Sequence, residues 1–166
     1  MSTQNVLRPP SRNEMKEVLT LCKKNEWATV LQLVKKNVLI GTATVPMSNH
    51  MLTTVCHQAL TSNSDIQPRT EVILQILQQT PEAAAIKNGY GTLCLHAVCQ
   101  RNLKCDAKTK ERLVLALIDA FPGALLQGGG AGMRTPLHII FTGTSENLIS
   151  IAKKSHLNRK RQTMSL

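Results

Sequence analysis

The chain has 166 residues, about the length of one domain, and 42% of them are hydrophobic, which suffices for a folded core and argues against a disordered chain. No run of 18 apolar residues appears and the N-terminus lacks an apolar signal segment, so we expect an intracellular protein, cytoplasmic or nuclear, without membrane insertion. Five cysteines at irregular spacing favour reduced, buried thiols over a disulfide framework.

The net charge of +10 is unevenly distributed. Residues 151–166 hold five cationic side chains and no acid, whereas residues 1–150 hold 15 cationic and 10 acidic side chains, so each part contributes +5. The chain has only four aromatic residues, too few for an extended surface that stacks bases. A nucleic acid is therefore an unexpected partner.

The N-terminal part predicts a flexible segment over residues 1–10 and a first helix that begins near Ser11. Ser11 and Glu14 have the spacing of a capping box, in which each side chain accepts a hydrogen bond from the backbone amide of the other residue. This signal marks where the folded part of the chain begins.

Three later segments share one apolar pattern, with starts 43 and 41 residues apart. They are VLQLVKKN (30–37), ILQILQQT (73–80) and VLALIDAF (114–121). Apolar residues at the first, second, fourth and fifth positions predict helices that bury one wide face. Pro81 and Pro122 follow the last two segments directly and predict that these helices end there.

A second series of segments precedes these helices, and each member contains one histidine. The segments are TVCHQAL (54–60), LCLHAVC (93–99) and TPLHIIF (135–141), with His57, His96 and His138. Thr135 has the character of an N-cap, and Pro136 then occupies the first helical position, where its missing N–H costs nothing. The chain thus holds about 3.5 copies of a two-helix unit, which predicts an all-α solenoid of stacked pairs.

These residues resemble ankyrin repeats. Residues 134–138 (RTPLH) match the TPLH opening of that family, residues 91–96 (GTLCLH) match it in part, and the phrases PEAAAIKNGYG and FPGALLQGGGAG resemble a long ankyrin variant of unicellular algae. The resemblance covers residues 15 to about 143. It implies helix-turn-helix repeats with projecting hairpin loops and a role in binding other proteins without catalysis.

The units are longer than the usual ankyrin repeat of about 33 residues. We place the additional residues between the two helices of a unit, in loops at 64–68 and 103–107. Insertions in repeat proteins map to loops on one face, so these two segments predict a repeated edge.

The glycine-rich segment QGGGAGM (127–133), which lies between two units, has two interpretations. It could cradle a phosphate, but the lysine of a P-loop is missing, and the alignment with the preceding unit favours a hairpin whose glycines adopt positive φ. Cys94, His96, Cys99 and Cys105 could likewise bind zinc, but their spacing is not that of paired zinc ligands, so we expect no metal or cofactor and apolar packing for the cysteines.

The three repeated histidines could act as catalytic bases. His57 follows Cys56, but neighbours on a helix point to different faces and do not form a catalytic pair. Recurrence once per unit favours a ladder, in which each ring bonds to backbone groups of its own or the next unit. We expect no enzyme activity.

The C-terminal region predicts a helix near 146–155 that covers the end of a solenoid spanning residues 11–156, followed by a basic flexible tail at 157–166. The cationic residues of this C-terminal region either keep it soluble or form a nuclear-import cluster. They are Lys153, Lys154, Arg159, Lys160 and Arg161.

The expected function is recognition of an acidic protein partner through the hairpin tips and the adjoining inner helices. The candidate contact residues are Lys87, Asn88, Tyr90, Gln100, Arg101, Met133 and Arg134. The alternative is binding of nucleic acid or an anionic surface through the basic tail, which would weaken steeply with salt.

Overall fold

The computed structural model describes residues 8–46, 52–62, 65–100, 103 and 105–142, and within them the chain is mostly helical. The described part contains seven α-helices and one antiparallel pair of two-residue strands. The helices are α1 (Arg12–Lys23), α2 (Trp27–Lys36), α3 (Val55–Thr61), α4 (Ile66–Gln79), α5 (Cys94–Cys99), α6 (Ala107–Ala120) and α7 (Pro136–Thr142). The strands are β1 (Val45–Pro46) and β2 (Leu52–Thr53).

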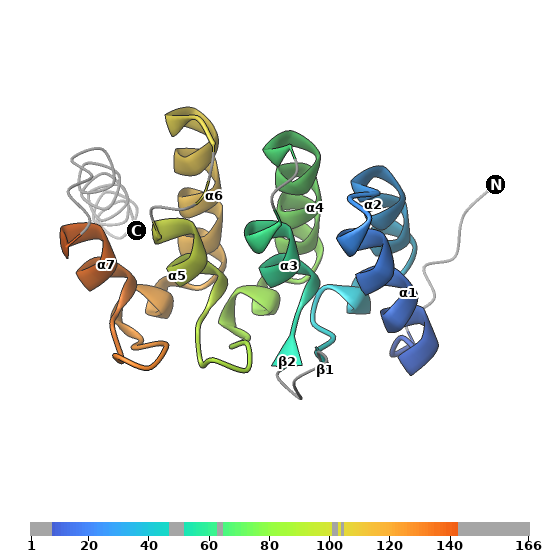
Figure 1. Cartoon of the computed structure of the whole chain (residues 1–166), viewed down its shortest axis with the longest axis horizontal. Coiled ribbons are helices and arrows are strands. Elements are labelled where there is room, and N and C mark those ends of the chain that lie inside the picture. The colour runs from blue at the N-terminus through green and yellow to red at the C-terminus, as the bar shows by residue number, and fades with distance from the viewer. Residues whose placement is uncertain (1–7, 47–51, 63–64, 101–102, 104, 143–166) are drawn as a thin grey trace, which may run out of the picture.

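The helices form a row of antiparallel pairs in chain order, α1 with α2, α3 with α4 and α5 with α6, and α7 follows them (Figure 1). Helices α1, α3, α5 and α7 contact one another in sequence and form one layer, while α2, α4 and α6 form the second. The loops that join one pair to the next project together at one edge of the row (Figure 1). One hydrophobic cluster runs the length of the row from Met15 to Ile140.

The predicted caps at Ser11 and Thr135 are confirmed. Ser11 and Glu14 form the capping box, with the Ser11 amide donating to Glu14 Oε2 at 2.7 Å and the Glu14 amide donating to Ser11 Oγ at 3.2 Å. The Thr135 hydroxyl accepts from the His138 amide at 3.2 Å, and Pro136 opens α7. Because these caps satisfy amides that lack helical partners, they fix where each helix begins.

The second helix of each pair begins earlier in the chain than the apolar segment that predicted it. Helix α2 has 10 residues, whereas α4 and α6 have 14 each. Residues 66–68, predicted to lie in a loop, instead form the first turn of α4, so that part of the prediction is wrong. Pro68 fits there because amides of the first helical turn have no intrahelical acceptor.

The predicted helix ends are confirmed at Pro81 and Pro122. Helix α4 ends at Gln79 and α6 at Ala120, and each proline begins a short 3-10 helix, Pro81–Ala85 and Pro122–Leu126. The first unit has a similar 3-10 turn without proline, Val38–Ile40. These turns, which the sequence patterns did not predict, lead the chain from each second helix into its loop.

Several predictions fall on residues outside the described part of the chain. They concern most of the N-terminal segment 1–10, the helix near 146–155, the tail 157–166 and its basic cluster. Among the described residues, no helix combines the length and apolar character that crossing a bilayer requires.

Candidate interaction surface

Three loops lie at the projecting edge, and we number them by residues: the first is 41–54, the second 86–93 and the third 127–135. The first contains β1 and β2, and the third contains a single antiparallel bridge between Gly129 and Arg134. The Gly89 amide of the second loop donates to the Leu52 carbonyl of the first at 2.7 Å. Successive loops therefore lie side by side.

A histidine from each of α3 and α5 joins its helix to the following loop, which confirms the predicted ladder for these two residues. His57 Nε2 lies 2.9 Å from the Thr92 carbonyl oxygen. His96 Nε2 lies 3.0 Å from the Gln127 carbonyl oxygen and 3.1 Å from that of Arg134. Carbonyls only accept hydrogen bonds, so both rings carry their proton on Nε2.

The other ring nitrogen of each histidine accepts a hydrogen bond within its own unit. The Thr54 hydroxyl lies 2.8 Å from His57 Nδ1, while the Leu93 amide donates to His96 Nδ1 at 3.1 Å. His96, at the third position of α5, thus bonds the amide of its N-cap residue, as the third-position side chain of a capping box does. Burial lowers the pKa of both rings, which favours the neutral form that this bonding needs.

His138 shows the local half of this arrangement. The Thr135 hydroxyl lies 2.7 Å from His138 Nδ1, and the side chain is exposed. The structural role that the repeat pattern predicts for His138 is therefore seen at its helix cap.

The glycines of the third loop serve two different purposes. Gly130 has φ +71°, as predicted for a turn glycine. A Cβ atom on Gly129 would lie 2.8 Å from His96 Nε2, and one on Gly128 would lie 2.6 Å from the Met133 carbonyl oxygen. The prediction that these glycines serve positive φ is thus wrong for Gly128, Gly129 and Gly132. Gly128 and Gly129 instead allow close approach, and the loop packs on His96.

A cysteine and a histidine meet in the core between α3 and α5. Cys94 Sγ lies 3.6 Å from His57 Nδ1, although the sequence suggested only the neighbouring Cys56 as a partner. A hydrogen bond with the Cys56 thiol and then burial raise the pKa of Cys94 well above its usual range. Cys94 is fully buried, so this pair lacks both the thiolate and the access that nucleophilic catalysis requires.

The other predicted zinc candidates are also accounted for. Cys99 is buried, and burial raises its pKa to about 12, whereas Cys105 is half-buried in the segment before α6. The apolar packing predicted for Cys94 and Cys99 is confirmed by their burial. In the described ranges, no three His, Cys, Asp or Glu side chains are grouped as metal ligands.

Among its described residues, each loop exposes one large apolar side chain. Leu52 of the first loop is 46% exposed, Tyr90 of the second 61% and Met133 of the third 71%. The cations Lys87 and Arg134 lie beside two of them and are exposed. We call these five residues the hairpin-tip surface.

The remaining predicted contact residues occupy different positions. Asn88 is half-buried, and its Oδ1 accepts from the amides of Tyr90 and Thr92 at 3.0 Å each, so this atom shapes the second loop. Gln100 is exposed at the end of α5. Arg101 lies outside the described residues. The sequence patterns missed Leu52, because it occurs in a loop that the repeat alignment did not cover.

Acidic residues are absent from the described residues of the three loops and of the helices α3, α5 and α7. The acids of residues 65–142 are Asp65, Glu71, Glu82, Asp106, Glu111 and Asp119. They lie on α4 and α6, at the caps of these helices or in the 3-10 helix after α4. Described residues of the three loops and of α3, α5 and α7 include no Asp or Glu, so the hairpin-tip surface has a positive potential.

A hollow of about 370 Å³ adjoins the third loop. Side chains of α5 and α7 line it through His96, Gln100 and Ile139, together with Arg134 and the loop glycines. Because Arg134 belongs to its lining, the hollow continues the hairpin-tip surface toward the first helix layer.

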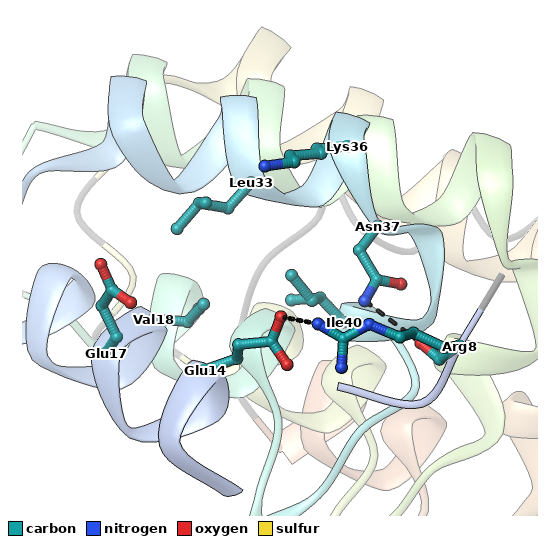
Figure 2. A pocket seen from close by; sticks show the side chains of 8 residues that line it. All are labelled: Arg8, Glu14, Glu17, Val18, Leu33, Lys36, Asn37 and Ile40. Carbon is teal, nitrogen blue, oxygen red and sulfur yellow. Dashed lines mark hydrogen bonds and ion pairs between the residues drawn. The ribbon is translucent and has the colours of Figure 1, made fainter. Parts of the chain in front are cut away.

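A second hollow, of about 250 Å³, lies at the N-terminal end of the row (Figure 2). Its apolar floor includes Val18 and Ile40. Arg8 crosses it: the guanidinium pairs with Glu14 at 2.9 Å, and Asn37 Nδ2 donates to the Arg8 carbonyl at 3.2 Å (Figure 2). The charge of Arg8 in this hollow is thus already paired within the chain.

The chain matches no protein-family model, no curated protein and no solved structure in the three comparisons.

Proposed function

We propose that this chain is an ankyrin-type solenoid that binds another protein, without catalysis, through the hairpin-tip surface and the neighbouring first helix layer. The solenoid assignment is supported by the row of helix pairs and by the histidine bonds that join each of two pairs to the next loop. The TPLH-like segments, which carry the resemblance to ankyrin repeats, supply these histidines and caps.

The observation that carries the binding proposal is the exposure of Leu52, Tyr90 and Met133 at the tips of three adjacent loops. Large apolar side chains at such exposure favour a contact that removes them from water. The surrounding cations, without any acid in the described loops, favour a partner of negative charge.

The test compares proteins that co-purify with three forms of the chain from cells expressing it. Lys87→Glu combined with Arg134→Glu reverses the charge of the hairpin-tip surface. Lys35→Glu combined with Lys108→Glu makes the same change in net charge at exposed positions of α2 and α6. We expect partners of the wild type to stay with the control and to be lost from the tip variant, with unchanged far-UV circular dichroism in both variants.

Equal recovery of the same proteins by all three forms would remove the hairpin-tip surface from consideration. Recovery of nucleic acid that depends on residues 153–166 and falls steeply with salt would favour the basic tail instead.

A further inference from the structure

The hollow beside the third loop contains hydrogen-bond donors without acceptors. His96 Nε2 is already bonded to two carbonyls, and the Thr92 hydroxyl donates to Asn88 Oδ1 at 2.7 Å. Arg134, in contrast, forms no ion pair or hydrogen bond through its guanidinium with any described residue. The hollow therefore offers one full positive charge that nothing in the described chain neutralises.

The position of Arg134 is set by the glycine loop. Its Cγ and Nε lie 3.6 Å from where a Cβ atom of Gly132 would be, so the side chain runs along the loop backbone. Gly130 and Gly132 line the same hollow, and their amides donate to no described residue. The planar guanidinium of Arg134 and the backbone amides of Gly130 and Gly132 are hydrogen-bond donors of the kind that bind a carboxylate.

Apolar groups flank these donors. Ile139 lines the hollow, and the exposed side chain of Met133 precedes Arg134. Tyr90 and Lys87 lie on the adjacent second loop, and both are exposed. A volume of about 370 Å³ is at the small end of ligand sites, which suits one or two side chains of a partner.

We propose that this hollow is a subsite for the carboxylate of an Asp or Glu side chain in an extended segment of the partner protein, held by Arg134 beside the apolar side chain of Ile139. The subsite rests on the proposed function and specifies the chemistry of its ligand. A single arginine among apolar groups fits one carboxylate better than the regular phosphates of a nucleic acid.

The experiment uses a random dodecapeptide phage library selected on the full chain, with an unrelated immobilised protein as background. We expect enriched peptides to share an acidic residue next to apolar residues. A synthetic peptide from this set and its Glu→Gln or Asp→Asn counterpart are then titrated against wild type, Arg134→Gln, Arg134→Lys and Lys108→Gln by fluorescence anisotropy.

For the acidic peptide we expect Arg134→Gln to weaken binding roughly five- to tenfold, Arg134→Lys to weaken it less, and Lys108→Gln to leave it unchanged. For the neutral counterpart, Arg134→Gln should have no effect, because the interaction that it removes is already missing. Urea midpoints of the variants confirm that each is folded.

Two results would overturn the subsite while leaving the proposed function intact: enriched peptides without a shared acid, or equal loss of both peptides on Arg134→Gln. Stronger competition by a thymidine dodecanucleotide than by the acidic peptide would assign the hollow to phosphates. Enrichment no higher than on the background protein would contradict the proposed function as well.

Discussion

At the scale of single residues, the two buried histidines show what repetition in a sequence reveals and what it conceals. One histidine per unit predicts a structural ladder, and His57 and His96 confirm it. The pattern could not reveal the acceptors, because Thr92, Gln127 and Arg134 contribute backbone carbonyls, which every residue possesses. It also could not reveal that Cys94 reaches His57, since that contact joins two units.

The lowered pKa of His57 and His96 predicts that the folded state weakens in mild acid. The unfolded chain binds protons near the ordinary histidine pKa of about 6.5, whereas the folded rings bind them only at lower pH. Stability is therefore complete above about pH 6.5 and is lost as the pH falls from there toward the folded pKa values. Urea unfolding at pH 7.5 and 5.5 measures this loss.

A variant with both His57→Gln and His96→Gln should be less stable at pH 7.5, by roughly 1–3 kcal/mol per site, and nearly insensitive to pH over this range. An unchanged pH dependence in the double variant would contradict the assignment to these two rings.

At the scale of elements, the apolar patterns predicted the centres of α2, α4 and α6 but not the added first turn of α4. The sequence contained a usable signal, because Asp65 and Asp106 cap the longer helices, accepting from the amides of Gln67 at 3.2 Å and Thr109 at 2.9 Å. Pro68 obscured that signal, since a proline near a helix start also fits a loop.

Arg69 of α4 has a structural role that the apolar pattern of this helix does not predict. A cation at this position suggests a solvated face, but Arg69 is 2% exposed. Its Nη1 donates to the carbonyls of Ala59 and Ser62 at 2.7 and 2.6 Å, and its Nε to that of Asp65 at 3.0 Å. Arg69 thereby binds the end of α3 to the start of α4, where helical carbonyls lack partners.

Arg69→Met should lower the free energy of unfolding by about 2–4 kcal/mol, because buried carbonyls lose a charged donor. Arg69→Lys should restore part of this loss. Arg112→Met is the matched control: Arg112 pairs with Glu71 at 3.2 Å at an exposed site, so its loss should cost under about 1 kcal/mol. Equal effects of Arg69→Met and Arg112→Met in urea titrations would contradict the capping role.

At the scale of the whole molecule, each helix contacts mainly its neighbours in the row. The repeat spacing and the alternation of two apolar series predicted helix pairs of this kind, and the helices are observed. The sequence could not predict how the loops pack, because that depends on close approaches such as Gly129 against His96. Nor could it predict the paired β1 and β2, whose two residues each are too short for a pattern.

Because each helix contacts mainly its neighbours in the row, we expect a destabilising substitution to affect only nearby helices and loops. His96→Ala should raise amide hydrogen exchange in α5, in the third loop and in α7, which contacts α5. Exchange in α1 and α2 should remain as in the wild type. Exchange mass spectrometry at pH 7.5 resolves these segments, and a uniform increase along the chain would show instead that the described units unfold as one.

The histidine bonds also impose an order on synthesis. Each ring can form its hydrogen bond only after the residue that supplies the carbonyl has been synthesised. Thr92 follows His57 by 35 residues, and Gln127 and Arg134 follow His96 by 31 and 38 residues. On the ribosome, the ring N–H of a helix pair therefore stays open to water until the loop of the next pair has emerged. Folding then follows translation with a lag of about one unit, because each new loop supplies the carbonyl that the histidine of the preceding helix pair needs.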